Sequence, residues 1–584
     1  MTDAQLGERS RRLDEPSALA SDGITVRWPV YEELLKRVER EGTVSGLPGY
    51  TLDRGLFTEG LDAIVANGTF SPEDADYVRR VVVQGADLGL DESMMRGKVV
   101  HRNYKSAYEH KEKVTDALRE RVRSGKTVKL GAFDGDARKL PGENATVVPL
   151  GAVPKKLERD KVRPFSDHTR SRFNAACGDT ARVKHTLDTY NEIGTELRYA
   201  YAMRVEDVDG AFTVLPLAPR VWKYMLVWWF DVDRPLEEQE GPNTLYMHVF
   251  ADFGTAPLPG IWHLFWRAVK AMAVSEGILT LPMPHFVDDN ALIGATVHEV
   301  DEVGDRLTDF LRVLGVPFKS LKSARAACRQ LCLGFWWDSV ERTRTLEEGK
   351  LQCYIDFFRA MAQRRVLTLT ELQSIAGRMH RASMTLAAGS RIFLASILAM
   401  MRGLRLPWHR RRVTAAARDD LRAIAAILEA NAGRGYFDIS HLPWAPGVFT
   451  DAMKDDGRAG WGWCDETGAF DYGVYGSSMR HKHIDELEGD AVRRAVAARA
   501  HTWQGCRVPV FIDNSAFQLS LKKGWSRAAR LTRIIKDLYS MSAPHDFILV
   551  PVWISTTENV GADALSRGNM AEFWQWLHHH VGGD

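Results

Sequence analysis

Two adjacent acidic residues, Asp288 and Asp289, interrupt an apolar stretch in the segment HFVDDNALIG, residues 285–294. Asn290 follows them, and a second apolar run begins at Ala291. Asp and Asn favour turns because their side chains bond to the nearby backbone, so β-prone runs on either side of them predict a β-hairpin. The carboxylates at its tip are either ordinary turn residues or ligands of a metal ion, and the rest of the sequence must decide between these interpretations.

The size and cysteine content of the chain narrow the class of protein. A length of 584 residues predicts a multidomain protein, and a hydrophobic content of 45% is sufficient for sizeable cores. The six cysteines include no CxxC pair, which argues against a zinc site or a disulfide framework and favours a reducing compartment. The N-terminal segment is too polar for a signal peptide, and no apolar run is long enough to span a bilayer. We therefore expect an intracellular protein, cytoplasmic, nuclear or both, without a membrane partner.

Positive charge is concentrated in one part of the chain. The formal net charge is only +1, so a nucleic-acid partner can be inferred only from a local excess of charge. Residues 359–412 hold eleven arginines and one acid, Glu371. Thr368 and Glu371 have the spacing of a helix-capping box, and Arg378 and Arg381 flank the apolar helix face that follows. The alternative is an ordinary solvated face, but such a face mixes both signs of charge, so the region favours a polyanion-binding surface.

Changes of pattern along the chain predict an α+β multidomain protein. From residue 126 to 337, β-prone runs alternate with helical pieces, and the last 140 residues predict two strands followed by helix, strand, helix, strand and helix. The expected segments are an N-terminal extension of unknown role (1–125), an α+β domain (126–337), an Arg-rich helical domain (338–405), a connector (406–445) and a C-terminal α/β domain (446–584).

Four further acids lie at the ends or rims of apolar elements in the C-terminal segment: Asp451, Glu488, Asp513 and Asp563. Each one alone is explained more simply as a cap or turn residue. Strand ends and helix starts can nevertheless gather carboxylates into one cluster, which stays ionised only if a cation neutralises it. Hard oxygen ligands suit Mg²⁺, and two such ions suit phosphodiester cleavage.

Together these motifs resemble the reverse transcriptase and ribonuclease H of retrotransposons, in particular the DIRS-like, tyrosine-recombinase class. FVDD resembles the catalytic hairpin, KVRPFSDHTRSRFN the fingers motif, DVDGAFTVLPL the first catalytic palm motif and FADFGTAPLPGIW the nucleotide-pocket motif. LGVPFKSLKS resembles the lysine-bearing palm motif, CLGFWWDS the primer-gripping hairpin and LTLTELQSIAGRMHRASM the thumb. The resemblance implies a right-hand polymerase, with fingers and palm in 126–337 and the thumb in 338–405, followed by an RNase H-like α/β domain.

The resemblance also implies roles for individual residues. Two Mg²⁺ ions, or Mn²⁺, would be held at each of two sites, the polymerase site by Asp207, Asp288 and Asp289, and the nuclease site by Asp451, Glu488, Asp513 and Asp563. Nucleotide contacts would come from Lys156 (with Lys155 as its rival), Arg163, Phe212, Phe253, Gly254 and Lys322 (with Lys319 as its rival). Nucleic acid would be contacted by Gly334, Arg378 and Arg381. Phe212 and Phe253 could also be plain core aromatics, which on sequence alone is the commoner role of such residues.

The implied function is an RNA-directed DNA polymerase joined to a ribonuclease H that cuts the RNA strand of the hybrid. Its partners would be an RNA template, a DNA primer, the RNA–DNA hybrid and deoxynucleoside triphosphates. The alternative is a non-catalytic or single-activity nucleic-acid-binding relic of a retroelement. The sequence predicts neither the template and priming mechanism nor the oligomeric state.

Overall fold

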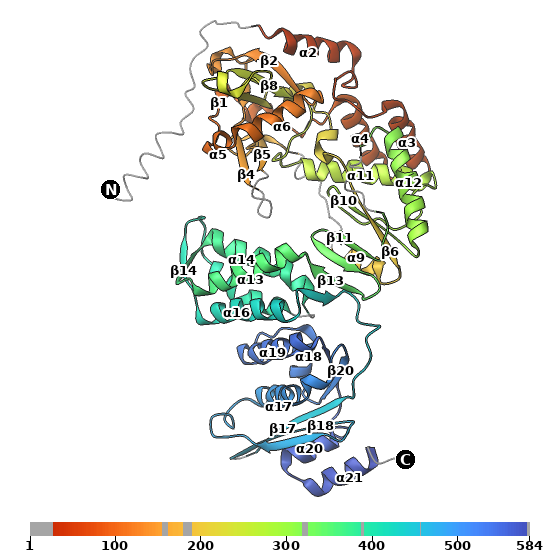
Figure 1. Ribbon diagram of the computed structural model, residues 1–584, viewed down its shortest axis with the longest axis vertical. Coiled ribbons are helices and arrows are strands. Elements are labelled where there is room, and N and C mark those ends of the chain that lie inside the picture. The colour runs from red at the N-terminus through yellow and green to blue at the C-terminus, as the bar shows by residue number, and fades with distance from the viewer. Residues whose placement is uncertain are drawn as a thin grey trace, which may run out of the picture. The chain divides into compact units, whose positions relative to one another are not determined.

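The computed structural model describes residues 27–154, 162–178, 190–317, 325–386, 390–455 and 457–580 (Figure 1). Lys155, Lys156, Lys319 and Lys322 lie outside these residues. Tertiary contacts divide the chain into two compact units. The first unit comprises Met1–Ile193 and Ala202–Ala327, and the second comprises Gly194–Tyr201 and Cys328–Asp584.

Helices from the N-terminal 125 residues contribute to the core of the first unit. They are α2 (Pro29–Glu41), α3 (Arg54–Ala66), α4 (Pro72–Gln84), α5 (Lys105–Glu109) and α6 (Lys111–Arg123). Asp53 and Ser71 cap α3 and α4 by accepting backbone N–H groups of the first turn. The ring of Phe57 on α3 stacks on that of Phe265 at 5.2 Å, and both are buried in one continuous cluster. The segment predicted as an extension is therefore built into this core.

Two sheets and a hairpin form the β-structure of the first unit. The five-stranded sheet has the order β1 (Lys98–Val100), β3 (Ala145–Val147), β7 (Leu226–Trp229), β8 (Thr244–His248) and β2 (Thr127–Ala132). The two-stranded hairpin joins β4 (Leu150–Pro154) and β5 (Val162–Ser166). The three-stranded antiparallel sheet has the order β6 (Ala202–Asp207), β10 (Asp289–Gly294) and β9 (His285–Phe286).

Among the described residues, the first unit also contains the helices α7 (Phe173–Ala176), α10 (Pro219–Trp222), α11 (Leu258–Ser275) and α12 (Val297–Val313). Helix α9 (Tyr190–Leu197) begins in the first unit and ends in the second. Most of α11 is buried, including Trp262 and Trp266. A helix that is apolar around most of its circumference belongs inside a core. Because α11 contacts α3 and also bonds to Val287 in the turn between β9 and β10, it links the N-terminal helices to the three-stranded sheet.

The first half of the second unit is a small sheet with a helical layer. The sheet has the order β11 (Arg329–Cys332), β12 (Phe335–Asp338), β13 (Thr343–Leu346) and β16 (Arg434–Tyr436). The helices are α13 (Glu348–Gln363), α14 (Leu369–Ala382), α15 (Ala395–Met401) and α16 (Ala415–Ala430). The predicted capping box of Thr368 and Glu371 is confirmed at the start of α14. Although α16 falls in the predicted connector, it packs against α13 as part of this layer.

The second half of this unit is a five-stranded mixed sheet covered on both faces (Figure 1). Its strand order is β19 (Phe470–Val474), β18 (Arg458–Asp465), β17 (Val448–Asp455), β20 (Arg507–Ile512) and β21 (Ile548–Trp553), with β17, β20 and β21 parallel. Helices α17 (Ile484–Arg499), α18 (Ser515–Lys523) and α19 (Ala529–Ser542) lie on one face, and α20 (Val560–Arg567) and α21 (Met570–His580) lie on the other. The predicted alternation of strands and helices is confirmed. Strand β19 was not predicted, and two segments that were predicted as single helices are each divided into two, α18 with α19 and α20 with α21.

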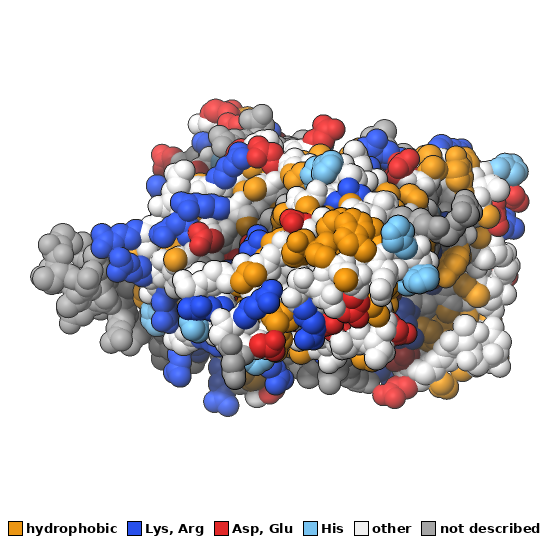
Figure 2. Space-filling view, turned by 90° about the horizontal axis from the view of Figure 1, so that it is seen from below, with side chains coloured by type: hydrophobic (Ala, Val, Ile, Leu, Met, Phe, Trp, Pro, Cys, Tyr) orange, Lys and Arg blue, Asp and Glu red, His pale blue; other side chains and the backbone are white. Residues whose placement is uncertain are grey.

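The surface carries both signs of charge. On the face shown in Figure 2, Lys and Arg side chains are interspersed with Asp and Glu side chains around apolar patches. Among the described residues, none of the helices combines the length and the hydrophobicity that a bilayer span demands.

Candidate active sites

Strand pairing brings the three predicted polymerase acids to one end of the three-stranded sheet. Asp207 ends β6, Asp289 begins β10, and the two residues are direct partners in the antiparallel register. The backbone N–H of Val208 donates to the Asp288 carbonyl at 3.3 Å. Asp207 is buried, whereas Asp288 and Asp289 are half-buried. The three carboxyl groups are less tightly gathered than those of the second site described below, which form the only close group of three ligands among the described residues.

The hairpin that carries Asp288 and Asp289 has a strained turn. Phe286 pairs with Asp289, so Val287 and Asp288 form a two-residue loop. Val287 has φ +59°, whereas Asp288 has no positive φ, which is the pattern of a type II′ turn. Glycine is usual at this position because a β-branched side chain is disfavoured there. The indole N–H of Trp262 donates to the Val287 carbonyl at 2.7 Å and so supports the strained residue from α11.

Asn290 fixes the other side of the hairpin. It is completely buried, and its Oδ1 accepts the indole N–H of Trp266 at 2.7 Å. Its amide nitrogen donates to the Asp288 carbonyl at 3.0 Å. Trp262 and Trp266 stack with ring centroids 5.6 Å apart, so one face of α11 holds both sides of the turn. From the sequence, Asn290 was predicted only as a turn residue, because its partner Trp266 lies 24 residues earlier in the chain and only the fold brings the two together.

Three predicted nucleotide-binding residues form a row. The Arg163 guanidinium on β5 lies 5.9 Å from the centroid of the Phe253 ring. The Phe253 and Phe212 rings meet edge-to-face at 5.3 Å. Phe212 is 9% exposed and Phe253 is 41% exposed, so the row leads from the core to the surface. Gly254 has φ +101°, and a Cβ there would lie 2.6 Å from the Ser166 carbonyl, which requires glycine at this position.

A half-buried ion pair lies next to this row. The carboxylate of Asp252 accepts the Ser166 hydroxyl at 2.6 Å and lies 3.5 Å from the Arg121 guanidinium. Arg121, on α6, also donates to the Phe250 carbonyl at 3.3 Å. Burial acts to raise the pKa of Asp252, but Arg121 and His248 outweigh it and lower the pKa to about 2. Arg121 was not predicted from the sequence, because no local sequence pattern indicates that an arginine in a charged helix pairs with a distant loop.

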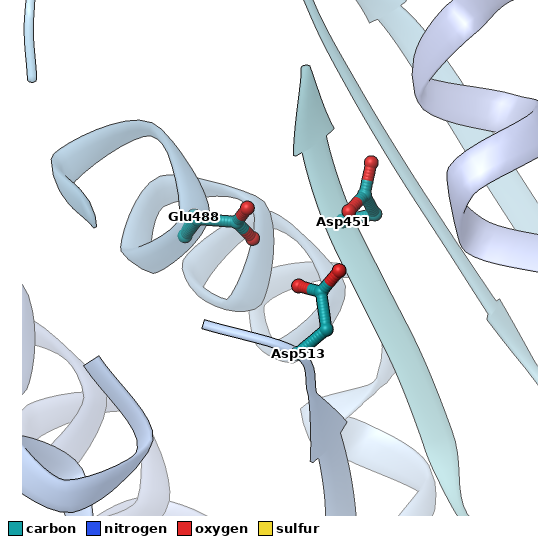
Figure 3. A group of neighbouring side chains, drawn as sticks. All are labelled: Asp451, Glu488 and Asp513. Atoms are coloured by element: carbon teal, nitrogen blue, oxygen red, sulfur yellow. The ribbon is translucent and has the colours of Figure 1, made fainter. Parts of the chain in front are cut away.

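The second site gathers carboxylates from three elements of the C-terminal sheet. Asp451 lies on β17, Glu488 lies one turn into α17, and Asp513 directly follows β20. Figure 3 shows their carboxyl groups directed toward one another, and each offers an oxygen within 4.8 Å of the others. Asp451 and Glu488 are buried, and Asp513 is half-buried. The predicted convergence of these three acids is what the strand order dictates, because β17 and β20 are adjacent and parallel.

The electrostatics of this cluster fit a divalent cation. Burial, together with the charges of Asp513 and Asp563, raises the pKa of Asp451 to about 7. Burial and the neighbouring Asp451 charge raise the pKa of Glu488 well above its usual value, and Asp513 is raised in the same direction. Glu488 Oε2 is buried with no hydrogen-bond partner among the described residues. A hard cation would relieve the repulsion and satisfy this oxygen.

The fourth predicted acid, Asp563, lies at the rim of the cluster. Its two carboxylate oxygens each accept from Arg567 Nε at 2.9 Å, one turn along α20. Its charge raises the pKa of Asp451 and of Glu488, so it is electrostatically part of the site. The buried Asn559 donates to the Thr450 carbonyl at 2.9 Å and thereby ties the start of α20 to β17, next to Asp451. Asn559 was not among the site residues predicted from the sequence.

The predicted nucleic-acid contacts on α14 have partners within the protein. Leu333 and Gly334 both have positive φ, as a type I′ turn between β11 and β12 requires. Arg381 donates to the Leu333 carbonyl, and its guanidinium lies 5.2 Å from the centroid of the Phe335 ring. The Arg378 guanidinium lies 3.5 Å from the centroid of the Phe357 ring. The structure thus brings Gly334 and Arg381 together and turns Arg378 inward.

Comparisons with known proteins give distant structural matches alone. No protein-family model and no curated protein sequence matches the chain. The similar solved structures include two of a foamy viral protease-reverse transcriptase, one in complex with an RNA/DNA hybrid and one, designated dRH, in complex with double-stranded DNA. Their sequence identities are 14% and 13% and their TM-scores 0.42 and 0.44. Each match covers 93% of this chain, which spans 65% of the first structure's chain and 84% of the second.

Proposed function

We propose that the chain is an RNA-directed DNA polymerase with ribonuclease H activity, from a retrotransposon of the DIRS-like class that its motifs resemble. The observation that carries the proposal is the presence of two separate carboxylate sites in one chain. Asp207 pairs with Asp289 on a hairpin in the first unit, and Asp451 meets Glu488 and Asp513 in the second. Copying RNA into DNA and then removing the RNA requires one phosphoryl-transfer site for each step.

The donor sets suit Mg²⁺ at both sites. Asp207, Asp288 and Asp289 would hold two ions in the first site, and Asp451, Glu488 and Asp513, with Asp563 at the rim, would hold two in the second. When bound, paired ions polarise the attacking oxygen and neutralise charge on the leaving group. The protein contributes rigid placement of the ligands: Asn290 holds the Asp288 backbone, and Asn559 holds the strand that carries Asp451.

The row of Arg163, Phe253 and Phe212 supports binding of a deoxynucleoside triphosphate. Arg163 is exposed and presents a positive charge to a triphosphate. The exposed Phe253 ring offers a stacking surface, and the buried Phe212 ring closes the floor of the pocket. A ring at this position would clash with a ribose 2′-hydroxyl and so favour deoxynucleotides. Lys156 and Lys322, which the motifs place at the triphosphate, remain part of the proposal.

Primer extension tests the proposal. The full chain is incubated with a poly(rA) template, an oligo(dT) primer and dTTP, with Mg²⁺ and then with EDTA. We expect extension that EDTA abolishes and that Asp207→Asn removes, because the carboxylates act through the metal. A folded protein that binds the hybrid but extends no primer would reject the polymerase and favour a relic that only binds nucleic acid.

A further inference from the structure

A two-stranded ribbon in the Arg-rich segment presents arginines to solvent. It joins β14 (Val366–Thr368) and β15 (Arg410–Arg412), next to the start of α14 (Figure 1). Leu367 pairs with Arg411, and Leu367 is completely buried, so it marks the inner face of the ribbon. Side chains alternate between faces along a strand, which places Arg410 and Arg412 on the outer face. All three arginines of β15 are exposed.

We use "basic ribbon" for the three exposed arginines of β15 together with the exposed arginines in the loops that flank the two strands: Arg364, Arg365, Arg402, Arg405, Arg410, Arg411 and Arg412. Little negative charge opposes it. Glu371, the one acid between residues 359 and 412, closes the capping box of α14 and lies 3.3 Å from Arg364. Within the described ranges, no carboxylate lies within ion-pair distance of Arg365, Arg405, Arg410 or Arg412. The outer face therefore keeps its positive charge.

The arginines of α14 behave differently. Arg378 stacks on Phe357 and Arg381 bonds to the Leu333 carbonyl, so both serve the packing of the helical layer. Holding several like charges unneutralised on one small surface costs free energy through mutual repulsion. That cost is offset when a polyanion binds, and it has no structural benefit in the free protein. Among the described residues of the Arg-rich segment, most of the arginines that are exposed to solvent lie on the ribbon, whereas Arg378 and Arg381 of α14 are packed against other elements.

An exposed aromatic ring accompanies the ribbon. Trp408 is 67% exposed, in the loop that leads into β15. The loop is held on both sides of it, because the backbone N–H of Leu369 donates to the His409 carbonyl at 2.8 Å and that of Thr370 to the Pro407 carbonyl at 3.2 Å. An exposed ring on a backbone that is held in place beside arginines is suited to packing on bases or sugars, since stacking adds affinity without sequence preference.

We propose that the basic ribbon is a clamp for the sugar–phosphate backbone of the RNA–DNA hybrid, with Trp408 contacting the same duplex. This inference rests on the proposed function for the identity of the polyanion. Among the described residues, the basic ribbon carries seven guanidinium groups and has Glu371 as its one neighbouring acid, so its contacts would be sequence-independent and would release counterions from the duplex.

Salt-dependent binding tests the clamp. The affinity of the full chain for a fluorescent RNA–DNA hybrid is measured by anisotropy over a range of salt concentrations. For Arg410→Gln/Arg412→Gln, we expect about a tenfold weaker affinity at moderate salt and a log–log salt slope smaller by about 2, because two phosphate contacts are lost. For Trp408→Ala, we expect a weaker affinity with an unchanged slope, because no charge is removed.

The matched control is Arg359→Gln/Arg422→Gln, which removes two exposed arginines from α13 and α16. Arg359 lies 2.6 Å from Glu429 and Arg422 lies 3.8 Å from Asp419, so their charges are already opposed. We expect this control to bind as the wild type does. Equal losses in both double variants would overturn the clamp, because only net charge would then matter. Unchanged hybrid binding with lost binding to phosphatidylserine vesicles would overturn it in favour of a membrane surface.

The extension assay separates this inference from the proposed function. If the protein extends primers but the ribbon substitutions leave its hybrid affinity unchanged, the clamp is wrong and the proposed function stands. If the protein extends no primer but the ribbon substitutions weaken its hybrid affinity, the clamp stands and the polymerase is wrong. Thermal unfolding of each variant shows that the fold is intact, which we expect because the substituted side chains are exposed.

Discussion

Asp207 and Asp289 lie directly opposite each other on adjacent antiparallel strands, and the hairpin that carries Asp289 is fixed from behind by Asn290. Strand pairing sets the spacing of two carboxylates that are far apart in sequence. The position of Asp288, one residue earlier in a strained turn, depends on side chains from α11. The geometry of the first site is therefore a property of the surrounding core as much as of the acids.

The hydrogen bond between Asn290 and Trp266 is expected to position the catalytic hairpin. Asn290→Leu keeps the volume but leaves the buried Trp266 N–H without its acceptor, which costs about 1–3 kcal/mol. We expect a lower thermal unfolding temperature for the first unit and a DNA synthesis rate reduced at least about tenfold, with RNA cleavage unchanged. Thermal scanning and single-turnover primer extension measure these effects.

The double variant Asn290→Leu/Trp266→Phe distinguishes positioning from simple stability. Replacing both partners by apolar groups removes the unsatisfied N–H, so much of the lost stability should return. The rate should stay low, because the Asp288 carbonyl has still lost the amide donor of Asn290 and keeps the longer bond from the Val208 N–H. Full recovery of the rate together with stability would show that Asn290 has no positioning role.

Arg121, on α6, is expected to support the proposed nucleotide-binding residues. Arg121→Ala removes the partner of the half-buried Asp252 carboxylate and the donor to the Phe250 carbonyl. The segment that carries Phe253 should loosen, so we expect the KM for dTTP to rise at least about tenfold with a smaller change in kcat. Steady-state kinetics measure both constants. Arg123→Ala, an exposed substitution two residues away, is the control, and an equal effect there would contradict the assignment.

Phe212 is expected to exclude ribonucleotides. The ring is nearly buried against Phe253, so Phe212→Ala would open space next to the sugar. We expect the ratio of kcat/KM for dTTP over that for UTP to fall at least about tenfold, because a steric clash of this size is lost. Primer extension with each nucleotide gives the ratio. An unchanged ratio with lower overall activity would assign Phe212 to the core alone.

Metal binding at the second site is expected to strengthen as pH rises. The pKa of Asp451 is raised from 3.8 to about 7, so the metal-free protein favours its protonated form. The raised pKa therefore stabilises the metal-free fold fully below about pH 4, and this stabilisation is lost as pH rises through 7. A bound cation, in contrast, needs the ionised carboxylate of Asp451.

Thermal unfolding of the second unit measures this pH dependence. We expect the increase in unfolding temperature caused by Mg²⁺ to be larger at pH 8 than at pH 6. Asp451→Asn, which cannot titrate, should reduce both the increase and its dependence on pH. An equal Mg²⁺ effect at both pH values in the wild type would contradict the electrostatic account of this cluster.

The sequence predicted those features that depend on local pattern. Residue spacing predicted the capping box at Thr368 and Glu371, and turn residues predicted the hairpin at Asp288. The positions of acids at the ends of apolar elements predicted that Asp451, Glu488 and Asp513 would converge. Turn chemistry and apolar periodicity are local signals, so they can be read without knowing the tertiary fold.

Features that depend on distant partners could not be predicted. Arg121 and Asn290 act through residues that only the fold brings near, and an arginine or asparagine has no local mark of such a role. The Arg-rich composition indicated a polyanion surface, but it could not separate Arg410, which the register of β14 and β15 directs outward, from Arg378, which stacks on Phe357. The roles of Lys156 and Lys322 stay predictions.

The most direct test of the two-site account compares Asp288→Asn with Asp513→Asn in the full chain. Each variant is assayed for primer extension on poly(rA)–oligo(dT) and for cleavage of the RNA strand in a labelled hybrid, with Mg²⁺ present. We expect Asp288→Asn to abolish DNA synthesis and retain RNA cleavage, and Asp513→Asn to do the reverse. Loss of both activities in either variant, from a protein that is still folded, would contradict two independent active sites.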